Sequence, residues 1–150
     1  MEILGQTTCE RGAYQKAQKL LDEALKLARE LNNHWYLHII FLALGELALN
    51  LACLEDAMTF YGESFTHCKG LGNDGAIANS IEGVAMVHAA RGQAEQAAHL
   101  FGAADSLRAK TNASLPAPQA REREHYMQKA RSALGDQAWE QAWSKGSVRQ

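Results

Sequence analysis

Two histidines four residues apart, His34 and His38, are the pair in this sequence whose spacing could support metal chemistry. Residues at i and i+4 share one face of a helix, so two imidazoles placed in this way could bind one zinc ion. No glutamate lies between them in a His-Glu-x-x-His order, and no third ligand is evident. We therefore expect no metal and no cofactor, and interpret both histidines as polar residues at the start of a helix.

Other patterns that could carry chemistry are also incomplete. Gly70, Gly72 and Gly75 form a glycine-rich stretch. No strand precedes them and no Lys-Ser/Thr pair follows, as a phosphate-binding loop requires. His67 and Cys68 fall at a helix end, where a cation is favourable and a thiol can pack. No Ser-His-Asp or paired-carboxylate signature stands out. The sequence therefore indicates that this chain is not an enzyme.

The composition is that of an ordinary globular chain. The 150 residues are 47% apolar and 21% charged, with a formal net charge of −2. Because no strong positive field is present, we expect no direct nucleic-acid binding. No apolar run is long enough for a transmembrane helix and no signal sequence is evident, so we expect no membrane contact and a cytoplasmic location.

Apolar periodicity and turn residues predict an all-α fold. After a short first helix over 2–10, helices are expected at 13–31, 34–51, 54–70, 74–90, about 93–110, 119–134 and 137–145. Asn32 and Asn33 end one helix, since asparagine tolerates the left-handed cap position, and Asp74 is expected to cap another. The turn at Arg91 and Gly92 uses the conformational freedom of glycine.

The apolar residues also predict which helix faces are buried. The 34–51 segment is apolar over more than one face, so we expect it to be covered on two sides. Trp139 and Trp143 should share one face and pack on the preceding helices. In the 13–31 segment the apolar residues recur every three or four positions and predict one buried stripe, formed by Tyr14, Ala17, Leu20, Leu21, Ala24, Leu25, Ala28 and Leu31.

The chain repeats itself with a period of 40 residues. Such a period, with small residues at fixed positions, indicates stacked helical hairpins. We expect one domain over 1–150, with hairpins at about 1–33, 34–73 and 74–113 and a capping helix pair at 117–145. Because the first helix is short, we also expect the chain to be a fragment of a longer protein. The alignment includes Leu4, Leu44 and Val84; Gly5, Gly45 and Ala85; Gly12, Ala52 and Gly92; and Ala17, Ala57 and Ala97.

These residue types and offsets resemble the tetratricopeptide repeat. Ala17, Ala57 and Ala97 are placed where two helices cross and only a small side chain fits. The usual tryptophan and terminal proline positions are absent, and the usual period is about 34. The resemblance implies a right-handed α–α superhelix. Further matching residues are Tyr14, Leu21 and Ala24; Leu54, Tyr61 and Ser64; and Ala94, Phe101 and Ala104.

The part from Gly72 to Gly146 is similar to the C-terminal region of large bacterial transcriptional regulators of the LuxR-type/STAND ATPase class. In these regulators an ATP-binding signalling module precedes a long repeat array. This resemblance implies a role in bacterial signal transduction and transcriptional regulation.

In such a stack the first helix of each hairpin lines a concave groove, which implies a non-catalytic scaffold for a protein or peptide partner. The amides of Asn50 and Asn79 could hold a peptide backbone, and Glu46 and Glu82 would make the groove mildly acidic. Two alternatives stay open, a small-molecule effector in the groove and a homodimer formed through the N-terminal end. The expected groove residues are Gln6, Glu10, Trp35, His38, Leu42, Glu46, Asn50, Asn79, Glu82 and Met86.

Overall fold

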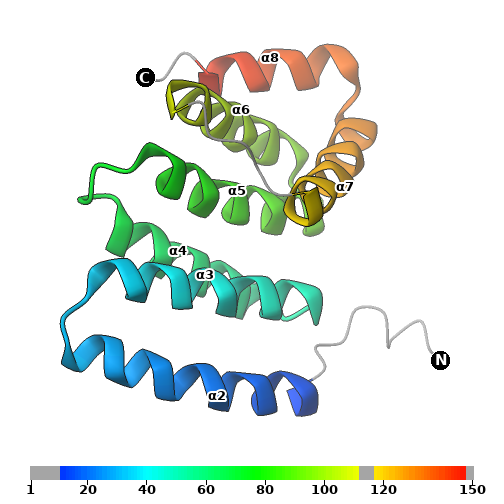
Figure 1. Ribbon diagram of the computed structural model, residues 1–150. Helices are drawn as coiled ribbons and strands as arrows, with labels where there is room; N and C mark the ends of the chain where they lie inside the picture. The colour runs from blue at the N-terminus through cyan, green and yellow to red at the C-terminus, as the bar shows by residue number, and fades with distance from the viewer. Residues whose placement is uncertain (1–10, 112–116, 148–150) are drawn as a thin grey trace. The chain divides into compact units, whose positions relative to one another are not determined.

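The computed structural model describes residues 11–111 and 117–147, and every element within them is a helix (Figure 1). The all-α class is therefore confirmed for these residues, whereas the tetratricopeptide superhelix stays a prediction. The helix expected at 2–10 lies outside them. The helices are α2 (Arg11–Glu30), α3 (His34–Asn50), α4 (Leu54–Cys68), α5 (Asp74–Ala90), α6 (Ala94–Thr111), α7 (Ala117–Leu134) and α8 (Asp136–Ser147).

Asparagines cap the starts of α3 and α5. Oδ1 of Asn33 accepts a hydrogen bond from the backbone nitrogen of Tyr36 at 3.1 Å, and Oδ1 of Asn73 accepts one from Ala76 at 3.0 Å. Each bond satisfies a backbone donor that the helix start leaves unpaired. The expected cap at Asp74 was wrong by one residue, because Asp74 is the first residue of α5 and Asn73 is the cap.

Several turns between helices use left-handed backbone conformations. Asn32 and Gly72 have φ values of 51° and 73°, and Ala52 and Gly92 have values of 63° and 81°. Within each pair the two positions are 40 residues apart, the spacing seen in the sequence. Glycine adopts this conformation readily, whereas an alanine there is strained.

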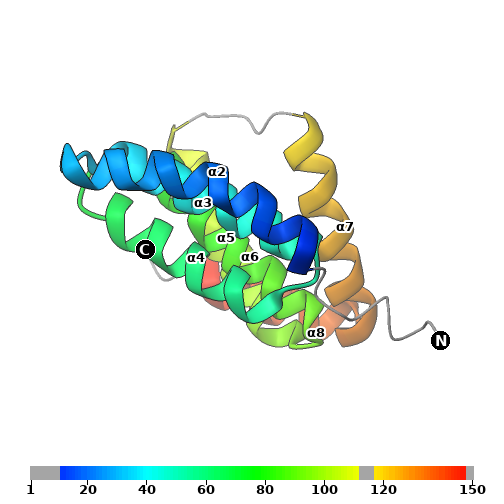
Figure 2. The same cartoon turned by 90° about the horizontal axis from the view of Figure 1, so that it is seen from below.

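The chain divides into two compact units, residues 1–72 and 73–150. In unit 1, α3 packs against both α2 and α4, and α2 runs along α3 when seen from below (Figure 2). In unit 2, α6 packs against α5, α7 and α8, and α7 also contacts α5 and α8. The expectation that all 150 residues form one continuous domain stays a prediction.

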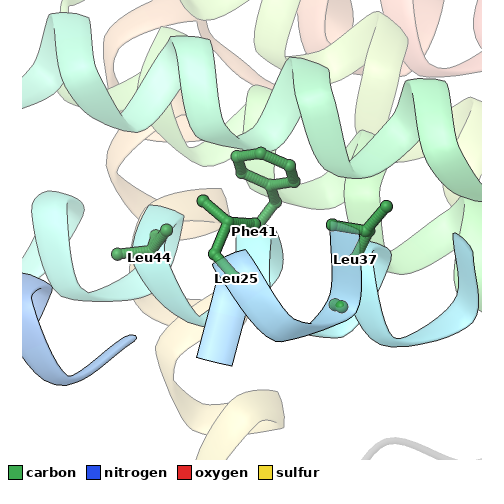
Figure 3. Close-up of a cluster of buried hydrophobic side chains, with 5 residues drawn as sticks. Leu25, Leu37, Phe41 and Leu44 are labelled. Carbon is green, nitrogen blue, oxygen red and sulfur yellow. The ribbon is translucent and has the colours of Figure 1, made fainter. Parts of the chain in front are cut away.

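The core of unit 1 between α2 and α3 is a small apolar cluster (Figure 3). It contains Leu25 and Ala28 from α2 and Leu37, Phe41 and Leu44 from α3. On both helices these residues recur every three or four positions, so each helix presents one apolar face to the other. Fully burying one such leucine or phenylalanine contributes about 1.5–3 kcal/mol.

The buried stripe of α2 is narrower than the sequence indicated. Leu25 and Ala28 are buried, but Leu20 and Leu31 are 75% and 72% exposed. With about 100° of rotation per residue, these two leucines point roughly 100° away from the buried face. The expectation that α3 has neighbours on two sides is confirmed, because α3 packs against both α2 and α4, but Trp35, Tyr36 and Ile39 remain exposed.

Unit 2 is packed mainly with small side chains, and its last helix lies very close to α6. A Cβ atom on Gly102 would collide with the carbonyl oxygen of Trp143, and one on Gly146 would collide with that of His99. The Ser147 hydroxyl donates to the Gly102 carbonyl oxygen at 3.3 Å. Glycine is therefore required on both sides of this contact.

The two tryptophans of α8 pack as the sequence predicts. Trp139 is buried, and its ring centroid lies 6.4 Å from that of Phe101 on α6. The half-buried Trp143 lies 5.7 Å from Trp139 between ring centroids. The indoles thus share the face of α8 that contacts the rest of unit 2.

Candidate functional site

The predicted groove residues are distributed over both units. Gln6 and Glu10 lie outside the described residues. Of the others, five lie on α3 in unit 1 and three on α5 in unit 2. Because the two units are separate bodies, each set is treated within its own unit.

Four of the predicted residues share one side of α3 with a residue that the sequence analysis did not select. Trp35 is 41% exposed, Asn50 is exposed, and Leu42 and Glu46 are half-buried. The additional residue, Ile39, is 40% exposed. Its signal was present in the sequence, because it continues the helical spacing from Trp35 to Leu42. These five residues are called the α3 open face below.

His38 is buried in the α3–α4 contact, beneath Trp35, whose ring centroid lies 5.4 Å from that of His38. The Ser64 hydroxyl donates to the His38 carbonyl oxygen at 3.0 Å, and its Oγ lies 2.8 Å from Nδ1 of His38. Since that hydroxyl proton goes to the carbonyl, Nδ1 must carry a proton and donate to Oγ. Burial lowers the pKa of His38, against the opposing effect of the hydrogen bond to the Ser64 backbone. His38 is therefore neutral and joins α3 to α4 through hydrogen bonds, and its buried ring is not accessible to a partner.

His34 and His67 form a second contact between α3 and α4. Their Nδ1 atoms are 3.0 Å apart, so one ring donates to the other, and the ring centroids are 5.2 Å apart. His67 also stacks on Phe41, with centroids 5.6 Å apart and an interplanar angle of 3°. Burial, and then the proximity of His34, lowers the pKa of His67. His34 thus faces His67 on α4, whereas His38 faces Ser64.

The three predicted groove residues of unit 2 belong to a buried polar network or lie beside it. Glu82 is 4% exposed, and its Oε2 accepts a hydrogen bond from Nη1 of Arg108. The same oxygen also forms an ion pair with Arg123, whose Nε lies 3.0 Å away but is not aligned to donate a hydrogen bond to it. Arg108 also donates from Nη2 to Oδ1 of Asn79 at 2.6 Å. Met86, one turn after Glu82, is buried as well.

This network corrects the expected charge of the groove. The Glu82 carboxylate is held by two guanidinium groups, so it does not give the surface of unit 2 an acidic character. Arg123 of α7 belongs to the same network, since its Nη2 lies 3.8 Å from Oδ1 of Asp105 and its Nε faces Glu82. The sequence contained the signal, because Arg123 is in helical phase with Met127 and the buried Ala130.

A hollow of about 510 Å³ lies on unit 2. The volume falls within the usual range for small-molecule pockets. Nδ1 of His88 lies 2.6 Å from Oε1 of Gln93 and must donate to it, which fixes the orientation of this ring. The hollow is lined by His88, Glu95, Gln96, His99 and Leu100.

Within residues 11–111 and 117–147, no group of three or more His, Cys, Asp or Glu side chains could hold a metal ion. No helix of that same part is long and apolar enough to cross a membrane. The chain matches no protein-family model, no curated protein and no solved structure. Membership of the tetratricopeptide family and of a bacterial regulator therefore stays a prediction.

Proposed function

We propose that this chain is a non-catalytic protein-interaction module that binds a peptide segment of its partner on the α3 open face. The observation that carries the proposal is the exposure of Trp35 and Ile39 on one side of a helix whose opposite side is buried. All exposed large apolar side chains within the described residues lie in unit 1. A tryptophan exposed in this way is a common binding hot spot, since it offers a large rigid contact area.

The geometry of the face suggests the chemistry of the partner segment. From Trp35 to Asn50 the helix rises about 22 Å, the length of roughly seven residues of extended peptide. Trp35, Ile39 and Leu42 would contact apolar anchors at one end of such a segment. Asn50 would donate and accept hydrogen bonds with the peptide backbone at the other end.

The test is selection of peptides from a displayed library against the whole chain, followed by titration of the selected peptides. Ile39→Asp should weaken binding at least about 10-fold, because an apolar anchor would face a carboxylate. Glu30→Gln, an exposed change on α2, is the matched control and should bind as the parent does. Circular dichroism would verify that both variants are folded. If no peptide is selected, or if Ile39→Asp binds equally well, the proposal is wrong.

A second candidate function is recognition of a small polar molecule, and the hollow on unit 2 is the observation that favours it. Its imidazole, carboxylate and amide groups can both donate and accept hydrogen bonds. Screening metabolites by thermal shift would test this function, because a ligand that binds the folded state raises the apparent stability. A hit should lose its effect in Glu95→Ala and retain it in Ile39→Asp.

The wider biological role follows only from the resemblance stated above. We infer from it that the partner belongs to a bacterial signalling or transcriptional system in the cytoplasm. The segment adjoining residue 1 in the genomic sequence would test that placement, since the resemblance predicts a signalling module there.

A further inference from the structure

A second, smaller hollow lies on unit 2, where α7 and α8 diverge from the turn at Gly135 (Figure 1). Its volume is about 220 Å³. This is room for about seven water molecules, so the hollow would take a molecule of no more than about ten non-hydrogen atoms. We call it the α7–α8 slot, and it is lined by Met127, Arg131, Trp139, Glu140 and Trp143.

The inner wall of the slot is apolar and comes from both helices. Trp139 is buried, whereas Trp143 and Met127 are half-buried. The two indoles are one turn apart on α8, with ring centroids 5.7 Å apart and an interplanar angle of 40°. Because Trp139 also packs on Phe101 of α6, this wall is formed before any ligand binds. Indole faces and a thioether offer close dispersion contacts, so the wall favours an apolar group.

Two opposite charges stand at the outer edge of the slot, one on each helix. Arg131 and Glu140 are both exposed. Nε of Arg131 donates to Oδ1 of Asp136 at 2.9 Å, and no hydrogen bond within residues 11–111 and 117–147 uses its two Nη nitrogens or the Glu140 carboxylate. The hydrogen bond to Asp136 and then the charge of Asp136 raise the pKa of Arg131, and the charge of Glu140 adds to this rise. The cation and the anion therefore lie near each other, and each has capacity for a further partner.

An apolar wall below a cation and an anion matches a small molecule that carries both charges beside one apolar group. The Nη nitrogens of Arg131 can donate two hydrogen bonds to a carboxylate, and Glu140 can accept from an ammonium group. A peptide terminus carries only one of these charges. We infer that the α7–α8 slot binds a free α-amino acid with an apolar side chain of about the size of leucine. This inference is independent of both proposed functions, because the slot shares no residue with the α3 open face or with the hollow beside His88.

The test is calorimetric titration of the whole chain with L-leucine up to about 10 mM, with tryptophan fluorescence as a second readout. We expect saturable binding and a change in fluorescence, because two indoles line the slot. Leucinamide lacks the carboxylate and 4-methylpentanoate lacks the ammonium group, so each should bind at least about 10-fold more weakly. Absence of leucine binding would overturn the inference. Equal binding of leucinamide would also overturn it, and would indicate a peptide N-terminus as the ligand.

Charge variants test the role of each residue. Arg131→Gln should bind leucine and leucinamide alike, and Glu140→Gln should bind leucine and 4-methylpentanoate alike, because each variant lacks the partner of one ligand charge. Lys129→Gln, an exposed change on the other side of α7, is the matched control and should keep the parental preference. Circular dichroism would verify that all variants are folded. A preference for leucine over leucinamide that persists in Arg131→Gln would refute the assignment. Glu95→Ala should leave leucine binding unchanged, and a loss there would place leucine in the hollow beside His88 instead.

Discussion

Removing the carboxylate of Glu82 is the most direct test of the reasoning about unit 2. The Glu82 side chain is 5% exposed, and the Arg108 and Arg123 side chains are 11% and 22% exposed. In Glu82→Ala both guanidinium groups lose their shared buried partner. Breaking a buried ion pair on one side costs about 3–5 kcal/mol, because the remaining charge is left uncompensated. Since Arg123 keeps its contact with Asp105, we expect the free energy of unfolding to fall by about 3 kcal/mol.

The assay is urea unfolding followed by circular dichroism, with Glu140→Ala on the exposed side of α8 as the matched control. A loss of about 3 kcal/mol is a large part of the stability of a domain of this size. Replacing Glu82 and Arg108 together by leucine and methionine should be less damaging than the sum of the two single changes, because neither Glu82 nor Arg108 is then left as a buried charge without the other. If Glu82→Ala unfolds at the same urea concentration as the control, the network does not hold α5, α6 and α7 together.

Three further predictions concern packing and pH. Gly146→Ala should destabilise unit 2 by about 1–3 kcal/mol or more, because the added Cβ would collide with the backbone of α6. Gly62→Ala has open space around the added Cβ and should be neutral or stabilise by up to about 1 kcal/mol. Thermal unfolding of the two variants and the parent would test this difference. Ala57→Leu should cost about 1–3 kcal/mol through overpacking of a fully buried position, and a parental melting temperature would contradict this. Because the folded pKa values of His38 and His67 lie below the ordinary 6.5, the unfolded chain binds more protons as the pH falls through that value. The urea midpoint should therefore be level above about pH 7 and decline below about pH 6.5, and a flat profile would count against both assignments.

The positions of the helices could be predicted from the sequence because local residues determine them. Asn33 and Asn73 cap helices through their own side chains, and Gly92 supplies the backbone conformation of its turn. Such signals act over a few residues, so they do not depend on how the helices later pack. This is why the predicted and observed helix bounds differ by only a few residues.

The faces of the helices and the polar network could not be predicted as well, because they depend on distant partners. Leu20 and Leu25 have the same chemistry, and only the position of α3 decides that Leu25 is buried and Leu20 is exposed. Glu82 looks like a surface acid by itself, and its partner Arg108 is 26 residues away. His38 was expected in the groove because its spacing fits, yet a single hydroxyl on α4 holds it inside.

The pair of glycines between α6 and α8 also limits how the end of unit 2 can move. If α8 moved by one residue, which requires a shift of about 1.5 Å along its axis and a rotation of about 100°, Lys145 or Ser147 would take the place of Gly146, and its Cβ atom would meet the α6 backbone. We therefore expect α8 to pack on α6 in one register only, and to be either fully packed or detached. Its amide hydrogens should exchange with solvent in step with those of α6, through joint opening of both helices and not through gradual sliding.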